Sequence, residues 1–292
     1  MSAGPPPPAP HTPEGLNART EALLRRLVRR DASTALRKLL RRTRPVDIAS
    51  SMRHLTGSEQ RRLYKAIDDL DVAAEVLSYL DDDGSREVTK GMDEDTVVPL
   101  LERMEPDDAT DIVAILPDEL RLRVLEELED DETGEEVREL LAWAPETAGG
   151  LMSPQVFRMA DTGTCGQAIA ALQTQHEDLE TVYYVYVVDH GQRLVGVCSL
   201  RSLLTHSPRT KLTEIMVPEV IAVAPDTDQE EVARYVARYD LLAVPVVDAH
   251  RHILGLVTVD DIVDVIRAEA AEDMMLMAGV NEAPQRSVMR QS

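Results

Sequence analysis

Carboxylates are the side chains of this 292-residue chain that are numerous enough and close enough together to do chemistry. Residues 68–140 hold 27 acidic and six basic side chains, a net charge of −21, and a second cluster of carboxylates follows between Asp228 and Asp273. Ligand sets made only of oxygen suit Mg²⁺ or Ca²⁺ and not zinc or copper. The alternative interpretation is a solvated acidic helical surface, which is the more usual role of such a segment.

The sequence lacks the residue patterns that other metal sites, disulfide scaffolds and catalytic sites require. The seven histidines are scattered. His250 and His252 fall in a predicted hairpin turn without a third ligand, so we interpret them as part of a solvated turn. Cys165 and Cys198 are too few for a disulfide scaffold and indicate a reducing cytoplasm. There is no P-loop, no G-x-G-x-x-G motif and no catalytic constellation, and we therefore do not expect an enzyme.

The charge is unevenly distributed along the chain. In total there are 31 basic and 53 acidic residues, a net charge of −22. This charge argues against nucleic acid as the main partner and against docking by general attraction to an anionic membrane. Residues 1–67 are the exception, with 14 basic and five acidic side chains. Their amphipathic, arginine-rich segment could contact lipid headgroups or an acidic partner, but a first helix hairpin with a solvated arginine face is the simpler interpretation.

The elements that position the first group of carboxylates form a repeat. A short acidic segment recurs every 24–25 residues, beginning at Leu55, Leu80, Met104 and Leu128, with apolar stripes of helical spacing beside it. One such unit cannot bury its own apolar face, so the pattern predicts helices stacked into an α-superhelix. No apolar run approaches the ~20 residues of a membrane helix. The proline-rich N-terminus is typical of a disordered extension.

The second half of the chain contains a different repeat. Leu151-Met-Ser-Pro recurs as Ile215-Met-Val-Pro, and Leu194-Val-Gly-Val recurs as Leu254-Gly-Leu-Val. In each copy a helical pattern precedes a strand, a turn, a second strand and a further helix. The sequence therefore predicts a β-α-β-β-α unit present twice. Its aliphatic helix faces, in a chain with 3% aromatic residues, predict a homodimer.

The tandem unit resembles a pair of CBS domains, and the order of acidic helical repeats followed by a CBS pair resembles the cytosolic part of MgtE-type magnesium transporters. The motifs that carry the resemblance are Ala148-Gly-Gly-Leu-Met-Ser-Pro, Glu180-Thr-Val-Tyr-Tyr-Val-Tyr-Val-Val-Asp, Asp226-Thr-Asp-Gln-Glu-Glu-Val-Ala-Arg and Thr258-Val-Asp-Asp-Ile-Val-Asp. The resemblance covers roughly residues 30–280 and does not include the family's membrane domain.

The resemblance implies a set of Mg²⁺ ligands. They are Glu75, Asp107 and Asp111 in the helical domain, Gly150 through its carbonyl at the boundary, Asp228, Glu230, Asp240, Asp261 and Asp264 in the second CBS unit, and Glu269, Glu272 and Asp273 in the connecting helix. Asp107 and Asp111 are four residues apart and share one helix face. Each residue taken singly could instead be a helix cap or a solvated charge, and Asp228 in particular has the spacing of an N-cap.

The resemblance to CBS pairs also implies ATP, or another adenine nucleotide, as a further ligand. Asp261, in Thr258-Val-Asp-Asp, matches the aspartate that binds the ribose hydroxyls in such units, and Tyr184 and Arg201 could stack and contact phosphate. The first unit has Ser202 where the corresponding carboxylate would stand, and Leu241 replaces the aromatic residue that faces adenine. We therefore expect weak nucleotide binding or none.

The predicted organisation is α plus α/β. Its parts are a disordered extension (1–18), an acidic α-superhelical MgtE N domain (19–144), CBS 1 (145–208), CBS 2 (209–267) and a connecting helix with a tail (268–292), with a mobile joint at 145–150. We expect a cytoplasmic Mg²⁺-sensing regulatory module, at the cytoplasmic face of the inner membrane when it is joined to a membrane pore domain. A nucleotide-sensing CBS adaptor and a helical scaffold without a ligand are the alternatives.

Overall fold

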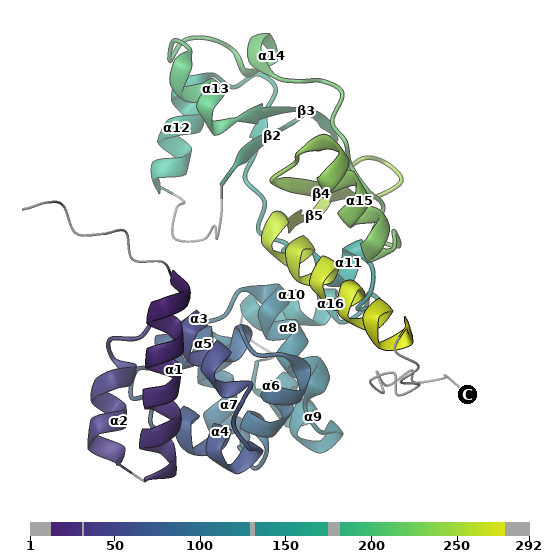
Figure 1. The fold of residues 1–292 in the computed structure, drawn as a ribbon. Coiled ribbons are helices and arrows are strands. Elements are labelled where there is room, and N and C mark those ends of the chain that lie inside the picture. The colour runs from purple at the N-terminus through teal and green to yellow at the C-terminus, as the bar shows by residue number, and fades with distance from the viewer. Residues whose placement is uncertain (1–12, 31, 129–131, 175–181, 278–292) are drawn as a thin grey trace, which may run out of the picture. The chain divides into compact units, whose positions relative to one another are not determined.

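The structure is a computed structural model that describes residues 13–30, 32–128, 132–174 and 182–277. The chain forms two compact units, residues 1–138 and 139–292 (Figure 1). The described part of the first unit is helical, and the second contains both sheets, so the predicted α plus α/β class is confirmed. No helix in these ranges is both long enough and apolar enough to cross a membrane.

The first unit is a series of short helices. They are α1 (Pro13–Arg29), α2 (Ser33–Leu40), α3 (Pro45–Met52), α4 (Gly57–Tyr64), α5 (Leu70–Ser78), α6 (Asp82–Thr89), α7 (Glu94–Leu101), α8 (Pro106–Ile115), α9 (Asp118–Glu127) and α10 (Glu132–Leu140). From α3 to α9 each helix packs against the next but one. Helices α5, α7 and α9 begin 24 residues apart, at Leu70, Glu94 and Asp118. Two helices therefore make one repeat, which confirms the predicted superhelix.

Helix ends explain much of the acidity of this unit. The N-caps of α5 to α9 recur every 12 residues, at Asp69, Asp81, Asp93, Glu105 and Pro117. The three aspartate side chains accept hydrogen bonds from backbone N–H groups, and every helix in this run has acidic residues in its first turn. Carboxylates at these positions stabilise the positive end of a helix dipole. A large share of the acidic residues is thus accounted for without a metal.

The second unit contains two small sheets. Strand β1 (Arg158–Ala160) pairs in parallel with β2 (Tyr184–Val188), which pairs antiparallel with β3 (Leu194–Ser199), and β4 (Ala243–Val247) pairs antiparallel with β5 (Ile253–Thr258). The helices are α11 (Ala148–Leu151), α12 (Cys165–Thr174), α13 (Leu200–Thr205), α14 (Leu212–Ile215), α15 (Gln229–Tyr239) and α16 (Val259–Met277). A parallel bridge from Val223 to Val246 is the counterpart of the β1–β2 pairing. The β-α-β-β-α unit therefore occurs twice, as predicted.

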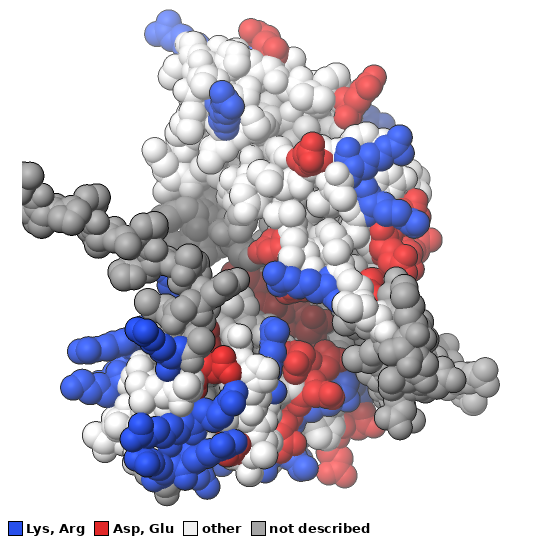
Figure 2. Space-filling model, viewed as in Figure 1, with Lys and Arg blue, Asp and Glu red and all other residues white. Residues whose placement is uncertain are grey.

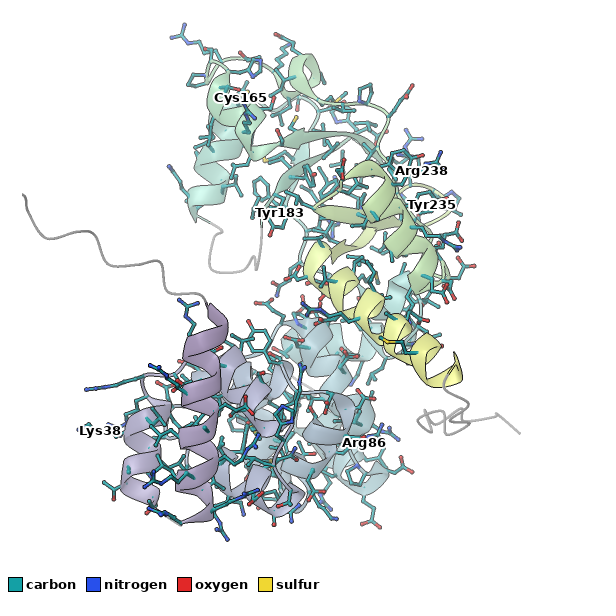
Figure 3. All side chains as sticks on the ribbon, viewed as in Figure 1. Lys38, Arg86, Cys165, Tyr183, Tyr235 and Arg238 are labelled. Carbon is teal, nitrogen blue, oxygen red and sulfur yellow. The ribbon has the colours of Figure 1, made fainter. Side chains whose placement is uncertain are left out.

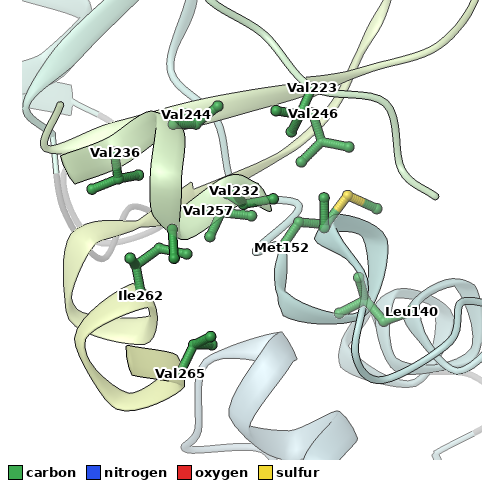
Figure 4. Packing of buried hydrophobic residues seen from close by; sticks show 12 residues of the cluster. Leu140, Met152, Val223, Val232, Val236, Val244, Val246, Val257, Ile262 and Val265 are labelled. Carbon is green, nitrogen blue, oxygen red and sulfur yellow. The ribbon is translucent and has the colours of Figure 1, made fainter. Parts of the chain in front are cut away.

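The segment that precedes each repeat packs on the other repeat. Met152 belongs to the buried cluster formed by β4, β5 and α15 (Figure 4). Beside it, Ser153 exchanges backbone hydrogen bonds with Leu256 of β5. In the same way Val217 exchanges backbone hydrogen bonds with Val197 of β3 in the first repeat. Neither repeat is therefore a contiguous stretch of the chain.

The divisions of the structure differ from the domain boundaries that the sequence predicts. The two units separate at 138/139 rather than 144/145, because Leu140 and Trp143 pack on the core of the second unit. Leu212, which lies beyond the predicted boundary at 208/209, is buried in the core of the first repeat. The predicted boundary at 267/268 falls inside α16, which is continuous from Val259 to Met277.

Two glycines make room for the exchanged methionines, and their surroundings lead to a prediction. A Cβ on Gly255 would come within 2.7 Å of the Met152 side chain and of the Ser153 carbonyl oxygen. For Gly196 the three nearest atoms all belong to the Met216 side chain, which can rotate away. We expect Gly255→Ala to lower the free energy of unfolding by about 1–3 kcal/mol, and Gly196→Ala by less. Urea unfolding of both variants measures this difference, and equal losses would contradict the packing.

Candidate metal-binding and nucleotide-binding sites

The helical unit carries three of the predicted ligands on α5 and α8, which contact each other. Asp107 lies in the first turn of α8, where helices α5 to α9 all have acidic residues. Glu75 and Asp111 differ, because each is the sixth residue of its helix and is exposed. Both lie beyond the first turn of the helix, whose four backbone N–H groups have no carbonyl partner within the helix. The favourable place of a carboxylate in the first turn of a helix therefore accounts for Asp107 and leaves Glu75 and Asp111 as the stronger candidate ligands in this unit.

A small hollow of about 50 Å³ opens beside Asp111. Its lining consists of Ser78, Leu80, Asp82, Ser85, Asp108, Asp111, Ile112 and Ile115. Two of the lining carboxylates, Asp82 and Asp108, were not among the predicted ligands. Each belongs to an acidic pair in a first helical turn, at 82–83 and 107–108. Those pairs were the signal in the sequence that could have indicated them.

In the second unit, three predicted ligands meet at the N-terminal end of α15. Asp228 is the N-cap of this helix, as its spacing predicted, and accepts a hydrogen bond from the Glu230 N–H at 2.9 Å. Between these two residues, the buried Gln229 donates from its side-chain amide to Oε1 of Glu269, in α16, at 2.9 Å. Carboxylates from two helices are thus held at one place by a hydrogen bond that the sequence pattern did not indicate.

The segment that follows α10 is fixed to the same place. Backbone hydrogen bonds join residues 146–149 to residues 225–229, which brings Gly150 to this end of α15. A Cβ on Gly150 would lie 2.4 Å from the carbonyl oxygen of Ala144, so the position needs glycine and offers a cation only its backbone. The mobile joint predicted at 145–150 is therefore wrong over 146–149, because these residues belong to the second unit.

The other predicted ligands of this unit have separate environments. Asp240 ends α15 in the left-handed conformation (φ 51°), which is strained for a residue with a side chain. Asp261 accepts a hydrogen bond from the Thr258 hydroxyl at 2.6 Å, and burial raises the pKa of Asp261 to about 6. Asp264 forms an exposed ion pair with Arg267 at 3.0 Å. Although Asp261 and Asp264 are three residues apart, Asp261 is half-buried in the first turn of α16, where it accepts from Thr258, and Asp264 is an exposed member of an ion pair.

No ready-made metal centre is visible among the residues with described side chains. Within that set, no three His, Cys, Asp or Glu side chains could together hold a metal ion. Glu272 and Asp273 lie in α16, but their side chains are outside the described residues. Mg²⁺ keeps several of its waters and is held by one or two carboxylates at a time. The arrangement thus suits weak, water-filled sites rather than a closed cage.

The residues predicted to bind a nucleotide meet at one end of β2. The Tyr184 hydroxyl, at the start of β2, accepts a hydrogen bond from the Leu242 N–H at 3.4 Å. The Leu242 carbonyl oxygen accepts a hydrogen bond from the Val259 N–H. This bond brings the first turn of α16, which contains Asp261, to the same place. Arg201 is exposed in the first turn of α13. The first residue of this helix, Leu200, donates its backbone N–H to the carbonyl oxygen of Tyr183, which directly precedes Tyr184. The structure therefore brings Tyr184, Arg201 and Asp261 to one end of the sheets.

The two cysteines have no place in a reactive site. Cys165, in the first turn of α12 (Figure 3), and Cys198, in β3, are both buried free thiols in the core of the first repeat. Burial raises the pKa of both thiols, that of Cys198 to about 11. Because the thiolate is the nucleophile, neither cysteine is activated. The expectation that Cys198 is a small core residue is confirmed.

The histidine turn gives a prediction for the pH dependence of stability. His252 Nδ1 lies 2.9 Å from Asp248 Oδ2, and its Nε2 lies 3.1 Å from the Gly191 carbonyl oxygen. The hydrogen bond to Asp248 raises the pKa of His252 above its usual value. The folded state thus binds this proton more tightly than the unfolded chain, whose histidine titrates near pH ~6.5. The stabilisation is fully present below that pH and is lost as the pH rises through the folded pKa.

We therefore expect His252→Gln to lower the thermal midpoint in mildly acidic buffer and to have little effect in mildly alkaline buffer. Thermal unfolding of both chains across this range measures the difference. A midpoint difference that is the same at both ends of the range would show that His252 titrates without a partner.

Comparison with known proteins places both units in one family. The model of the MgtE intracellular N domain matches residues 43–146, and that of the CBS domain matches residues 212–268. Over 149 residues the chain is 46% identical to the magnesium transporter MgtE of Thermus thermophilus, a match that covers 51% of this chain and 33% of that protein. The chain thus spans about one third of the length of the curated relatives that it matches.

Two solved structures resemble most of this chain. A crystal structure of the cytosolic domain of the Mg²⁺ channel MgtE in complex with ATP is 36% identical, with a TM-score of 0.76, over 84% of this chain and 99% of that one. A crystal structure of the soluble part of a magnesium transporter is 32% identical, with a TM-score of 0.73, over 87% of this chain and 99% of that one. The chain therefore belongs to the MgtE family of magnesium transporters, and it carries the N domain and CBS domains that this family has in its cytosolic part.

Proposed function

We propose that this chain is the Mg²⁺-sensing regulatory module of a magnesium channel or transporter and has no catalytic activity of its own. In this proposal Mg²⁺ bridges carboxylates of the helical unit to carboxylates of the second unit, and the closed form shuts the gate of a membrane pore domain, the proposed partner. The observation that carries the proposal is the net charge of −21 on residues 68–140, together with a second unit that gathers Gly150, Asp228, Glu230 and Glu269 at one helix end.

The physical basis is the difference between the two forms in their affinity for the cation. Two acidic surfaces repel each other, and monovalent salt screens that repulsion only over ~8–10 Å. A hydrated Mg²⁺ between two carboxylates stabilises the closed form more than monovalent salt does, because it binds both carboxylates at once. A ligand shifts an equilibrium only through its differential affinity for the two states, so each weak bridge adds to the stability of the closed form.

The strained helix end at Asp240 supports the proposal. A glycine or asparagine at a left-handed C-terminal position would be more stable than aspartate. A carboxylate at the negative end of a helix dipole is a further disadvantage. Residues in sparsely populated backbone conformations cluster at functional sites, where the surrounding structure holds them in place. We infer that Asp240 is a ligand.

A second candidate function is the sensing of adenine nucleotides. It is favoured by the meeting of Tyr184, Arg201 and Asp261 at one end of β2, and by the ATP in the related cytosolic domain. Against strong binding stand Ser202 and Leu241, which supply neither the second carboxylate nor the aromatic face. In this chain we propose ATP as a weak additional ligand.

We further propose that the CBS repeats form a homodimer. Leu204 of α13 and Val263 and Ile266 of α16 are exposed apolar side chains, with exposed fractions of 66%, 39% and 47%. They lie on the helices that follow β3 and β5, which are equivalent in the two repeats. Light scattering should give the mass of two chains, and a mass near 32.4 kDa with and without Mg²⁺ would contradict the proposal.

One set of thermal-unfolding measurements tests these functions together. Mg²⁺, Ca²⁺, ATP and AMP are added separately, since a ligand that binds only the folded state raises the midpoint. The proposal expects a rise with Mg²⁺. A rise with nucleotide alone would favour a nucleotide-dependent adaptor, and no response to any of the four would indicate a scaffold.

A further inference from the structure

A cluster of cations covers the N-terminal end of the helical unit. Lys and Arg gather over α1 and α2, at the lower left of Figure 2, and Lys38 extends from α2 into solvent in Figure 3. We define the basic surface as the exposed residues Arg26, Arg30, Lys38, Arg42 and Arg44. They come from α1 and the residue after it, from α2 and from the turn after α2, and α1 packs directly against α2.

The basic surface is distinct from the arginines that stabilise the fold. Other arginines of this region have acidic partners, and the pairs are Arg25 with Glu21, Arg29 with Glu59, and both Arg37 and Arg41 with Asp68. The five cations of the basic surface have no carboxylate within 4.0 Å among the residues that the structure describes. The acidic repeats therefore do not neutralise them, and these cations are available to an external anion.

Apolar groups lie among these cations. Leu23 is 43% exposed and shares a face of α1 with Arg26, three residues further on, and Arg30 follows directly after the end of this helix. Val46, which follows closely after Arg44, is 47% exposed. A hollow of about 350 Å³ lies along α1, and the described part of its lining is Ala22, Arg25, Arg26, Arg29 and Arg30. The apolar stripe of α1 itself is buried in the core, at Leu24 and Val28, so an exposed leucine beside arginines is a separate feature that can enter a lipid headgroup layer while the arginines contact phosphate.

We infer that the basic surface docks on the anionic headgroups of a lipid bilayer, with Leu23 and Val46 in the headgroup layer. The inference rests on the proposed function in one respect, namely that a module joined to a membrane pore works beside a bilayer. The net charge of −22 does not forbid docking, because exposed charges more than ~10 Å from the contact are screened at moderate salt. What decides the contact is the local charge, which is positive here.

The alternative partner with the same phosphate chemistry is nucleic acid. Single strands are usually bound by aromatic side chains on which bases stack, together with a cationic groove. Among the described residues that define the basic surface or line its hollow, none is aromatic. Exposed aliphatic side chains pack well against the acyl chains just below the lipid headgroups, but they offer no flat surface on which a nucleic-acid base could stack. The observations therefore favour lipid.

The test is flotation of the full chain with vesicles, in EDTA and without Mg²⁺, so that carboxylates cannot be bridged to phosphate. Vesicles of phosphatidylcholine are compared with vesicles that also contain phosphatidylglycerol. One variant replaces Arg26, Arg30, Lys38 and Arg42 by Gln. A matched control variant, with the same change in net charge, replaces the exposed second-unit residues Arg209, Lys211, Arg234 and Arg238 by Gln.

We expect the parent and the control variant to float with the anionic vesicles at a moderate ~0.1 M salt, where distant acidic charges are screened, and to be released at high salt. Each cation near an anionic surface strengthens binding about fivefold, so the variant that lacks four of them should bind nearly three orders of magnitude more weakly. Leu23→Gln should weaken binding severalfold without changing its salt dependence.

Three results would overturn the inference. They are absence of the parent from the anionic vesicles, equal binding by the two Gln variants, and displacement from the vesicles by a single-stranded RNA that binds the same surface more tightly. The last result would assign the surface to nucleic acid. Since the assay contains no Mg²⁺, a chain that fails the Mg²⁺ test can still pass this one, and the reverse also holds.

Discussion

A chain that carries Glu75→Gln and Asp111→Asn is expected to keep its helical content and stability while losing most of its response to Mg²⁺. Both residues are exposed on contacting helices, beyond the first turn, so helix capping does not require them. We expect the Mg²⁺ concentration that gives half of the thermal stabilisation to rise at least about tenfold, the equivalent of ~1.4 kcal/mol of lost binding. A titration of the thermal midpoint with MgCl₂ measures this change.

The matched control carries Asp83→Asn and Asp95→Asn, which remove the same charge from the same unit. Both are exposed first-turn residues, of α6 and α7. They act on the helix dipole, so each change should cost about 0.3–1 kcal/mol of stability and leave the Mg²⁺ titration nearly unchanged. Equal loss of the Mg²⁺ response in both variants would mean that the acidity acts only through net charge.

Ser202→Asp combined with Leu241→Phe is expected to strengthen ATP binding by about 10–100-fold, because a hydrogen bond to a charged group contributes ~1.5–3 kcal/mol. In the second repeat the Asp261 carboxylate accepts from the Thr258 hydroxyl. In the first repeat the Ser202 N–H donates to the Ser199 hydroxyl, and the carboxylate is missing. The added ring would also give adenine a stacking surface at the end of α15.

Isothermal titration with ATP at constant Mg²⁺ measures this gain, and Asp261→Asn in the doubly substituted chain is the matched control. We expect that control to lose the gain, because the amide cannot replace the charged acceptor. Tight ATP binding by the unmodified chain, or no gain in the double variant, would refute the view that Ser202 and Leu241 have disabled the pocket.

The parts of the fold that sequence predicted are those set by local pattern. Apolar stripes of helical spacing gave the repeat of the first unit, and the paired strand motifs gave the two β-α-β-β-α units. The exchange of Met152 and Val217 between repeats was missed, because it depends on packing between segments that are distant in the chain. The glycine that receives Met152 is only recognisable once the strands are placed.

In the candidate site, too, the features set by local sequence were predictable and the contacts between distant residues were not. Asp228 as an N-cap followed from spacing, and the structure agrees. The contact of Gln229 with Glu269 could not be foreseen, since it joins residues 40 positions apart. Sequence also could not separate Asp107, which serves a helix end, from Glu75 and Asp111. That distinction needed the 12-residue spacing of the helix starts.

The most direct test of the account is small-angle X-ray scattering of the full chain across a Mg²⁺ titration, with KCl of matched ionic strength as the parallel series. We expect millimolar Mg²⁺ to reduce the radius of gyration, because bridging brings the two acidic units together, and KCl to produce only a small part of this change. Full compaction in the KCl series, or no compaction with Mg²⁺, would show that Mg²⁺ does not bridge the two units.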